Sequence, residues 1–460
     1  MPVFTDARGV AVTAATPDAV AHLDASVAAF LAFRTDTGER LKPALAADPD
    51  CVAANVQRGY YMMLMANRTL VPRAAKSLAA AEAGAGGATA REQAHVAALR
   101  AWVGGDFAGA TARWEALLAD HPRDVMAMRL ASYGHFYAGD GAMMRASFER
   151  CLHAWDESVP GYGFQLGAYA FALEEAGDYP SAERSGRRAV EINPSDAWAT
   201  HAVAHVMEMQ GRSAEGVDWI TGLEGNFGET HNFIFHLWWH RALFHWELGR
   251  YDRVLEIYDR EVRPESTDDG LEIANACSLL WRLEHAGVDV GGRWEELARQ
   301  ATARLDDHML VFNDVHFAMA LAAAGDAAAR EAWRASCRTF AAGDESQGAV
   351  MAACGLDAIE GVLAFRRGDY GEAADRLTAA RPALRRLGGS HAQRDIFQQM
   401  LAVAALRAGR WTTARALWSE RIHRGPATAW GWSCFAEALS GAGDVTAAAN
   451  ARARAAAIAV

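Results

Sequence analysis

Closely spaced cysteines, long apolar runs and an excess of positive charge are all missing from this 460-residue sequence. The six cysteines lie far apart and none forms a Cys-x-x-Cys pair, which argues against a thiolate zinc site or a disulfide framework. No apolar run approaches the roughly 18 to 20 residues that a membrane span requires. The amino terminus carries Asp6 and Arg8 where a signal peptide would have an apolar core. We therefore expect a cytoplasmic protein with no membrane partner.

The charge balance of the sequence argues against a nucleic acid partner. The sequence has 45 Lys and Arg against 57 Asp and Glu, a formal net charge of −12. A net acidic chain repels phosphate backbones, so we expect no nucleic acid partner. Hydrophobic residues make up 51% of the sequence and only 12 residues are proline, which excludes a disordered or collagen-like chain and leaves enough apolar surface for a large core.

A short phrase recurs along the chain: glycine, then Asp or Arg, often an aromatic residue, and alanine three positions further on. The glycines of this series are Gly105, Gly139, Gly177, Gly211, Gly249, Gly325, Gly368, Gly409 and Gly443, and Gly287 fits between them. The steps between them run from 34 to 43 residues, and Pro122, Pro194 and Pro426 fall near the ends of repeats. A period of about 34 residues with a tight glycine turn between two helices is the signature of the tetratricopeptide repeat.

We therefore predict an all-α protein, a right-handed α-α superhelix of about ten to twelve tetratricopeptide-like helix pairs. Val, Ile and Thr are scarce beside Ala and Leu, and apolar residues recur every three to four positions, so few segments resemble strands. Residues 1–90 are predicted to form an irregular helical N-terminal cap. Residues 91–460 are predicted to form the repeat superhelix, continuous with the cap as one domain.

The repeat register places several large side chains on the concave surface of the superhelix. We predict that these residues bind the substrate: His95, Trp102, Tyr133, Phe136, Trp198 and Trp239. Solenoids that grip acidic peptide tails usually carry Lys, Arg and Asn on this surface instead. An inner wall of aromatic residues and histidines favours a pocket for a small or aromatic molecule.

Histidines on two consecutive inner helices form the main candidate site. His201, His205 and Glu208 are spaced i, i+4 and i+7, so their directions lie within roughly 60° of one another on one helix. His236 belongs to the next inner helix, where His240 follows one turn later. Imidazoles that converge from neighbouring helices can hold a divalent metal ion, here zinc, iron or manganese. The predicted metal ligands are His201, His205 and His236, with Glu208 as a further ligand or as the general base.

His240, His316 and Asp314 are additional catalytic candidates. Asp314 and His316 are two residues apart, roughly 200° around a helix, so both cannot face one pocket. The register favours His316 but leaves the choice open. Two other interpretations of these groups also stay open: acid–base chemistry without a metal, because histidine titrates near neutral pH, and a purely structural polar core.

Several phrases resemble the tetratricopeptide repeat protein 38 family. They are Arg91-Glu92-Gln93-Ala94-His95, His121-Pro122-Arg123-Asp124, Asp196-Ala197-Trp198, the segment 201–208, Phe312-Asn313-Asp314-Val315-His316-Phe317, Gly291-Gly292-Arg293-Trp294, Gly388-Gly389-Ser390 and Ala392-Gln393-Arg394-Asp395. The resemblance extends from about residue 20 to residue 420. It implies a helical-repeat protein and implies no activity, substrate or cofactor.

Two functions follow from these observations. The favoured one is an enzyme, a metal-dependent hydrolase or lyase that acts on a small molecule inside the superhelix. The alternative is a non-catalytic adaptor that binds a protein or peptide partner. A closed pocket with converging imidazoles would support the enzyme, and an open groove would support the adaptor. We allow for a homodimer in either case.

Overall fold

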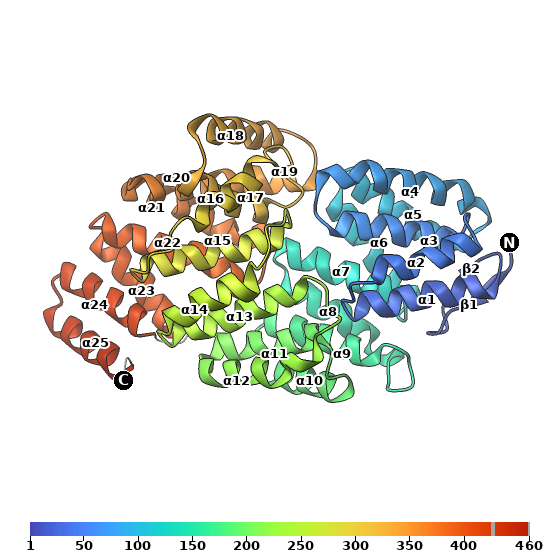
Figure 1. The fold of residues 1–460 in the computed structure, drawn as a ribbon, viewed down its shortest axis with the longest axis horizontal. Helices are drawn as coiled ribbons and strands as arrows, with labels where there is room; N and C mark the ends of the chain where they lie inside the picture. Colours follow the sequence, from blue (N-terminus) through green and yellow to red (C-terminus); the bar gives the residue numbers. More distant parts are fainter. Residues whose placement is uncertain (425–427, 459–460) are drawn as a thin grey trace. The chain divides into compact units, whose positions relative to one another are not determined.

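The computed structural model describes residues 1–424 and 428–458 (Figure 1). Helices from α1 to α25 make up most of these residues, and the only sheet among them is the antiparallel hairpin of β1 (Val3–Thr5) and β2 (Ala11–Thr13). The predicted fold class, an all-α stack of tetratricopeptide-like helix pairs, is confirmed. Pro426, which the repeat register placed near the end of a repeat, lies outside the described residues.

The recurring Gly-Asp phrase folds as two helix caps in succession. Between α5 (Ala90–Val103) and α6 (Phe107–Asp120), Gly105 has φ 84° and the Asp106 N–H donates to the Ala101 carbonyl at 2.8 Å. The Asp106 carboxylate then accepts the Gly109 N–H at 2.8 Å. Glycine ends the first helix because other residues rarely adopt positive φ, and aspartate begins the second because its oxygen satisfies a free N–H.

The predicted turns are confirmed throughout the series. A helix pair turns at each of the glycines predicted from the repeat, including Gly287. All of them have positive φ except Gly325, which has φ −73° and ψ 150° after α17 (Val311–Ala324). The next helix, α18 (Ala327–Ala341), still begins at an aspartate cap, because Asp326 accepts the Ala329 N–H at 2.7 Å.

The chain divides into two compact units. The first comprises Met1–Val203, Leu223–Ile234 and Asp344–Gly348, and the second comprises Ala204–Gly222, Phe235–Gly343 and Ala349–Val460. Helix α11 (Ala197–Gln210) contributes residues to both. The predicted division into an irregular helical cap, residues 1–90, and a repeat superhelix, residues 91–460, that continue as one domain stays a prediction.

In the first unit, helices follow one another as antiparallel pairs (Figure 1). Besides α5 and α6, these are α1 (Pro17–Leu31) with α2 (Thr37–Ala47), α3 (Val52–Leu64) with α4 (Val71–Gly84), α7 (Val125–Ala138) with α8 (Gly141–Cys151), and α9 (Tyr162–Glu175) with α10 (Tyr179–Ile192). Glu92 of α5 ties β2 to this stack, because it accepts the Thr13 N–H and hydroxyl at 3.0 and 2.7 Å. Sequence periodicity missed the hairpin because each strand has only three residues.

The second unit continues the same pattern. Its helices are α12 (Ser213–Leu223), α13 (Phe233–Glu247), α14 (Tyr251–Ile257), α15 (Gly270–His285), α16 (Arg293–Thr302), α17, α18, α19 (Ser346–Val350), α20 (Leu356–Arg367), α21 (Tyr370–Ala380), α22 (His391–Arg407), α23 (Trp411–Arg424), α24 (Ala429–Gly441) and α25 (Val445–Ile458). Trp333 and Trp418 are fully buried in its apolar core.

One segment satisfies the length and composition test for a membrane span, contrary to the sequence prediction. Ser346–Arg367, which contains α19 and α20, has 22 residues and a mean hydropathy of 1.6. The prediction that no apolar run reaches this length is therefore wrong for this segment. Because 67% of its apolar window is buried inside the protein, the segment has the burial of a core helix.

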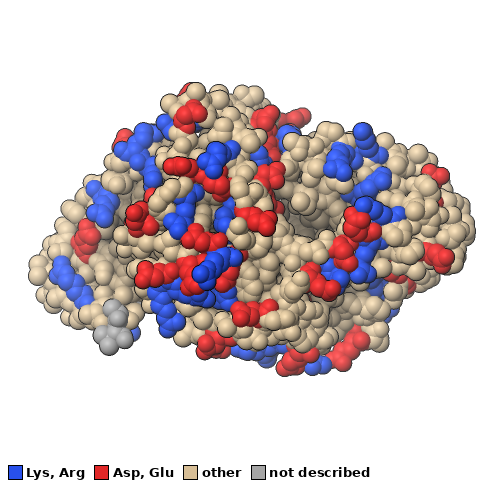
Figure 2. All heavy atoms as spheres, viewed as in Figure 1, with Lys and Arg blue, Asp and Glu red and all other residues tan. Residues whose placement is uncertain are grey.

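Charges of both signs are interspersed on the face shown in Figure 2. Ion pairs at the surface join charges of opposite sign, for example Arg366 with Glu284 at 2.6 Å and Arg293 with Asp259 at 2.7 Å. On this face, the described residues form no extended patch of a single sign of the kind that steers charged partners.

Helix α12 offers a matched pair of glycines for testing the packing. A Cβ on Gly216 would lie 2.4 Å from the Phe244 ring, whereas a Cβ on Gly222 would meet none of the described atoms within 4 Å. Gly216→Ala should therefore lower the free energy of unfolding by about 1–3 kcal/mol. Gly222→Ala should leave it unchanged or raise it by up to about 1 kcal/mol. Urea denaturation of both variants measures the difference, and equal shifts would contradict the packing.

Candidate metal and acid–base site

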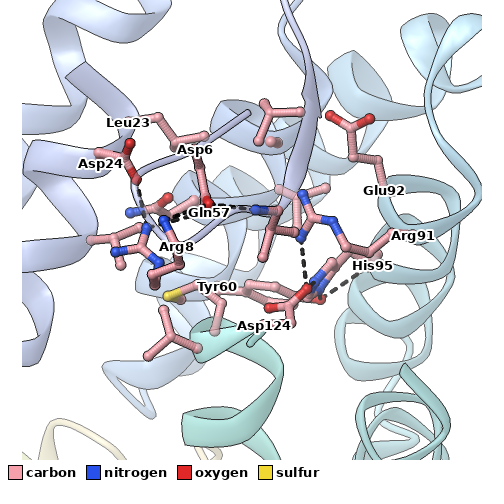
Figure 3. A pocket seen from close by; sticks show the side chains of 17 residues that line it. Asp6, Arg8, Leu23, Asp24, Gln57, Tyr60, Arg91, Glu92, His95 and Asp124 are labelled. Atoms are coloured by element: carbon pink, nitrogen blue, oxygen red, sulfur yellow. Dashed lines mark hydrogen bonds and ion pairs between the residues drawn. The ribbon is translucent and has the colours of Figure 1, made fainter. Parts of the chain in front are cut away.

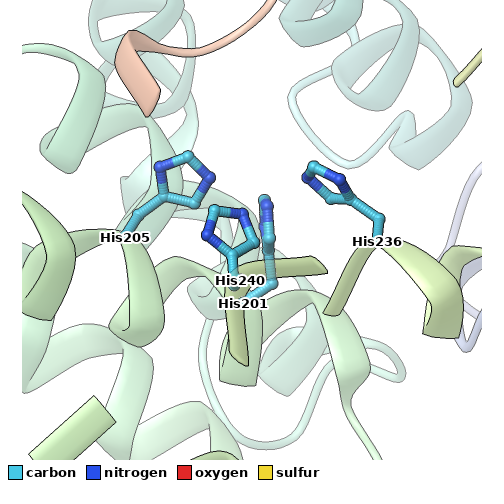
Figure 4. Close-up of side chains that lie close together, drawn as sticks. All are labelled: His201, His205, His236 and His240. Carbon is cyan, nitrogen blue, oxygen red and sulfur yellow. The ribbon is translucent and has the colours of Figure 1, made fainter. Parts of the chain in front are cut away.

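Four buried histidines from two inner helices lie close together (Figure 4). His201 and His205 are on α11, and His236 and His240 are on α13. Each offers a ring nitrogen, and these nitrogens all lie within 4.8 Å of one another. None of the four residues is more than 4% exposed. His205, His236 and His240 belong to the second unit, so two of the three ligands suggested by the sequence lie together with His240 there, whereas His201 belongs to the first unit.

Neighbouring side chains orient the two rings on α13. His240 Nδ1 lies 2.8 Å from Glu208 Oε2 of α11, and His236 Nδ1 lies 3.2 Å from Asn275 Oδ1 of α15. An oxygen acceptor at Nδ1 places the ring proton there, which leaves the lone pair on Nε2. Histidines that bind metal ions are held in this way by a second set of residues. Glu208 therefore has the position of an orienting residue for His240.

Burial favours the neutral form of these imidazoles. It holds the pKa of His205 well below its ordinary value, with smaller contributions from the nearby His236, His391 and Arg394. It also lowers the pKa of His236 to about 4, against a weaker opposing effect of the hydrogen bond to Asn275. A neutral imidazole is the form that binds a metal ion, so these rings need no deprotonation near neutral pH.

Two carboxyl groups of the second unit lie within electrostatic reach of each other. Burial raises the pKa of Glu208 to about 8 and that of Glu247 to about 7, and Arg282 opposes both shifts. Glu247 Oε2 is buried and has no hydrogen-bond partner among the described residues. A carboxyl group with a pKa near neutrality is suited to proton transfer. The sequence analysis gave Glu247 no role.

An ion-pair network next to these carboxyl groups was not predicted. Asp395 of α22 pairs with Arg421 of α23 and accepts the Gln399 amide at 2.6 Å. Burial opposes ionisation of Asp395, but Arg421 and Arg282 hold its pKa below the ordinary value. Arg282 comes from α15, more than a hundred residues earlier in the sequence. Only the Ala392–Asp395 phrase pointed to this region.

Asp314 and His316 both lie on α17 but contact different neighbours. Asp314 Oδ1 lies 2.9 Å from His308 Nδ1. The His316 ring packs against Phe312 and Phe397, and its Nδ1 lies 2.8 Å from the Phe312 carbonyl oxygen. Burial lowers the pKa of His316 to about 4. The sequence left open whether Asp314 or His316 faces the pocket, and the structure places the two side chains in different surroundings.

The predicted aromatic residues of the first unit form one series of ring contacts. Trp198 packs against Tyr133 and Phe171 with ring centroids 5.9 and 5.0 Å apart, and Phe171 also packs against Phe136. Trp102 packs against Phe107, which is connected to Phe136 through Tyr137. Trp239 stacks on His236 at 5.2 Å and donates its N–H to the Ser278 hydroxyl at 2.9 Å. Of these aromatic residues, Trp239 is the one in direct contact with a histidine of α13.

His95 lines a pocket of the first unit, beneath the amino-terminal hairpin (Figure 3). His95 Nε2 and Arg91 Nη1 lie 2.9 and 2.6 Å from the same oxygen of Asp124, so two of the phrases noted in the sequence meet here. The Tyr60 hydroxyl lies 3.0 Å from His95 Nδ1. On the hairpin side, Arg8 pairs with Asp24 of α1 at 2.6 Å. The Arg8 pair attaches the hairpin to α1, whereas the bonds of His95 join α3, α5 and the start of α7.

The fold and the site define a tetratricopeptide-like helical-repeat protein. No known family's profile matches the chain. It is similar to solved structures of low identity. One is the human IFIT1 dimer with m7Gppp-AAAA, with 14% identity over 98% of this chain and 96% of that chain and a TM-score of 0.39. Another is a tetratricopeptide repeat protein from Parabacteroides merdae, with 13% identity over 65% of this chain and 93% of that chain and a TM-score of 0.29. Similarities with such low TM-scores do not indicate a ligand or a partner of this chain.

Proposed function

We propose that this repeat protein holds a divalent transition-metal ion on His205, His236 and His240 and uses it to hydrolyse or cleave a small molecule. The observation that supports the proposal is the grouping of these ring nitrogens within 4.8 Å, with Nδ1 of His236 and His240 oriented by Asn275 and Glu208. Three neutral nitrogen ligands leave a position for water or substrate. An ion bound there would polarise a carbonyl group or lower the pKa of a bound water.

We assign different roles to the residues around these histidines. His201, one turn before His205 on α11, belongs to the first unit and is not part of the proposed ligand set. Glu208 positions His240, and Glu247 is the candidate for moving a proton, because burial brings its pKa to about 7. The Trp239 ring on His236 supplies an apolar side to the site. A small molecule suits a site whose histidines are this deeply buried.

We also propose membership of the tetratricopeptide repeat protein 38 family. The phrases that carry the resemblance supply contacts within each unit. In the first unit, Arg91 and His95 bind Asp124 of another phrase. In the second, Glu208 and His205 come from one phrase and Asp395 from another. Side chains that form specific polar contacts carry more family information than the general repeat residues.

Metal analysis of protein purified without an affinity tag tests the function directly. We expect one zinc, iron or manganese ion per chain, or saturable uptake of one Zn²⁺ ion by metal-free protein in a competition titration. In a crystal of the loaded protein, nitrogen–metal distances should be about 2.0–2.1 Å. Folded protein that neither retains nor takes up an ion would overturn the proposal. The histidines would then be a structural polar core, and the adaptor alternative would gain.

A further inference from the structure

A serine, a histidine and an aspartate of the second unit form a continuous hydrogen-bonded series. His308, in the segment between α16 and α17, has Nδ1 2.9 Å from Asp314 Oδ1 and Nε2 2.8 Å from the Ser336 hydroxyl oxygen. Asp314 is on α17 and Ser336 is on α18. The three residues thus come from separate elements and meet at one imidazole.

The direction of these hydrogen bonds follows from the chemistry of the partners. A carboxylate can only accept, so the His308 proton resides on Nδ1 and points to Asp314. The Nε2 lone pair must then accept the Ser336 O–H. A serine whose proton is accepted by an imidazole, with a carboxylate fixing the tautomer of that imidazole, is the arrangement that activates a hydroxyl nucleophile.

Solvent accessibility is lowest at Asp314 and highest at Ser336, as a nucleophilic serine that must meet a substrate requires. Asp314 and His308 are 1% and 4% exposed, whereas Ser336 is only partly buried. The Phe340 ring stacks on the His308 ring at 5.0 Å and covers it. The series therefore has a dry interior and an outer end at the hydroxyl.

The backbone at His308 has an unfavourable conformation that the surrounding structure must hold in place. His308 has φ 48°, in the left-handed region that residues other than glycine rarely adopt. The preceding segment is fixed by Arg304, whose guanidinium pairs with Asp307 at 2.6 Å. Strained residues of this kind persist where the surroundings over-determine them, often at functional sites.

A metal ion is a poorer explanation for this cluster than for the one on α11 and α13. Cys337 lies beside His308 and Asp314 and could complete a set of three ligands. However, both His308 nitrogens already have hydrogen-bond partners, so neither is left to bind an ion. Burial also raises the pKa of the Cys337 thiol, which opposes the thiolate that a metal requires.

We propose that Ser336 is a nucleophile activated by His308 and Asp314, reactive toward small acyl esters. Ser336 Oγ would bond to the carbonyl carbon while its proton passes to His308 Nε2. The carbon–oxygen bond to the alcohol would break, and the alcohol would leave with that proton. Water would then cleave the acyl-serine, which restores the hydroxyl and releases the acid. This site is independent of the histidines on α11 and α13.

Labelling with an ethyl fluorophosphonate probe tests the nucleophile, because phosphorus–oxygen bond formation releases fluoride and needs the same proton acceptor. Peptide mass spectrometry should place the adduct on Ser336. Ser336→Ala should remove it, and His308→Asn, which tolerates positive φ, should slow labelling at least about a hundredfold. Ser433→Ala, at an exposed serine of α24 whose hydroxyl donates to the Ala429 carbonyl, should label like the wild type.

A rescue experiment separates chemistry from folding. Glycine readily adopts the backbone conformation of residue 308, so His308→Gly removes the imidazole with the least strain. Added imidazole should restore labelling of Ser336 in this variant, and p-nitrophenyl acetate hydrolysis should follow the same order across all variants. Folded wild-type protein without an adduct on Ser336, or labelling that is equal in the wild type and His308→Asn, would overturn the proposal.

Discussion

Replacing His240 with glutamine is expected to lower the affinity for Zn²⁺ by more than about a hundredfold. The side chain would keep most of its volume but would lose the Nε2 donor that His240 can offer once Glu208 holds its Nδ1. The loss should exceed the 10–100-fold effect typical of removing an orienting residue. Competition titration with a zinc chelator on metal-free protein measures the change.

Two further variants make this result specific. Glu208→Gln should weaken binding by about 10–100-fold, because the amide can turn its NH2 group toward His240 Nδ1 and then no longer keeps the ring proton on that nitrogen. His423→Gln, at an exposed histidine of α23 whose Nδ1 lies 2.7 Å from the Ser419 carbonyl oxygen of its own helix, should bind like the wild type. Equal affinity of all three variants, each with an unchanged melting curve, would show that zinc binds elsewhere or not at all.

Replacing Asp196 with asparagine is expected to remove a large pH dependence of stability. Asp196 is 1% exposed, and burial raises its pKa to about 7 from an ordinary 3.8. One oxygen caps α11 by accepting the Ala199 N–H at 2.9 Å, and the other has no hydrogen-bond partner within the described part of the chain. The folded state therefore keeps a proton that the unfolded state releases.

The sign and size of this effect follow from proton linkage. Because the folded-state pKa is the higher one, the stabilisation is complete below about pH 4 and is lost progressively as the pH rises to about 7. Three pH units at about 1.4 kcal/mol each give a loss of up to about 4 kcal/mol. An asparagine at this position would retain the cap without the charge, so Asp196→Asn should equal the wild type near pH 4 and exceed it by about 2–4 kcal/mol at pH 8.

Urea denaturation from pH 4 to pH 8 measures the difference. Asp106→Asn is the matched control, because Asp106 caps α6 in the same way but is exposed. That variant should show no such gain in stability over the wild type between pH 4 and pH 8. A parallel pH profile for the wild type and Asp196→Asn would show that Asp196 is already ionised in the folded protein.

The fold was predictable because its information is local. Each Gly-Asp phrase determines a helix end and the following helix start through bonds that span only a few residues, as at Gly105 and Asp106. The hairpin escaped prediction since its attachment depends on distant partners, such as Glu92 for Thr13. Short strands held by tertiary contacts leave little periodicity to detect.

The candidate site was likewise predictable where it depends on local sequence and unpredictable where it depends on distant contacts. The spacing of His201 and His205 on α11 can be deduced from helical geometry, and the repeat register added His236. The orienting contacts could not be deduced, because Glu208 reaches His240 over 32 residues and Asn275 reaches His236 over 39 residues. The Ser336–His308 contact likewise joins two elements through a backbone conformation that no sequence pattern announces.

The double cap at the Gly-Asp turns also explains how repeats of unequal length coexist in one chain. Because the turn satisfies its own backbone hydrogen bonds, residues can be added elsewhere in a repeat without altering it. In 34-residue steps between successive turn glycines, the helix that follows the turn has 14 residues, as in α6 and α10. In the 38-residue steps that begin at Gly139 and Gly211, this helix has 11 residues, as in α8 and α12. The additional residues of these steps therefore lie in the connection to the next helix, and a lineage of such proteins can vary these connections while the turns stay the same.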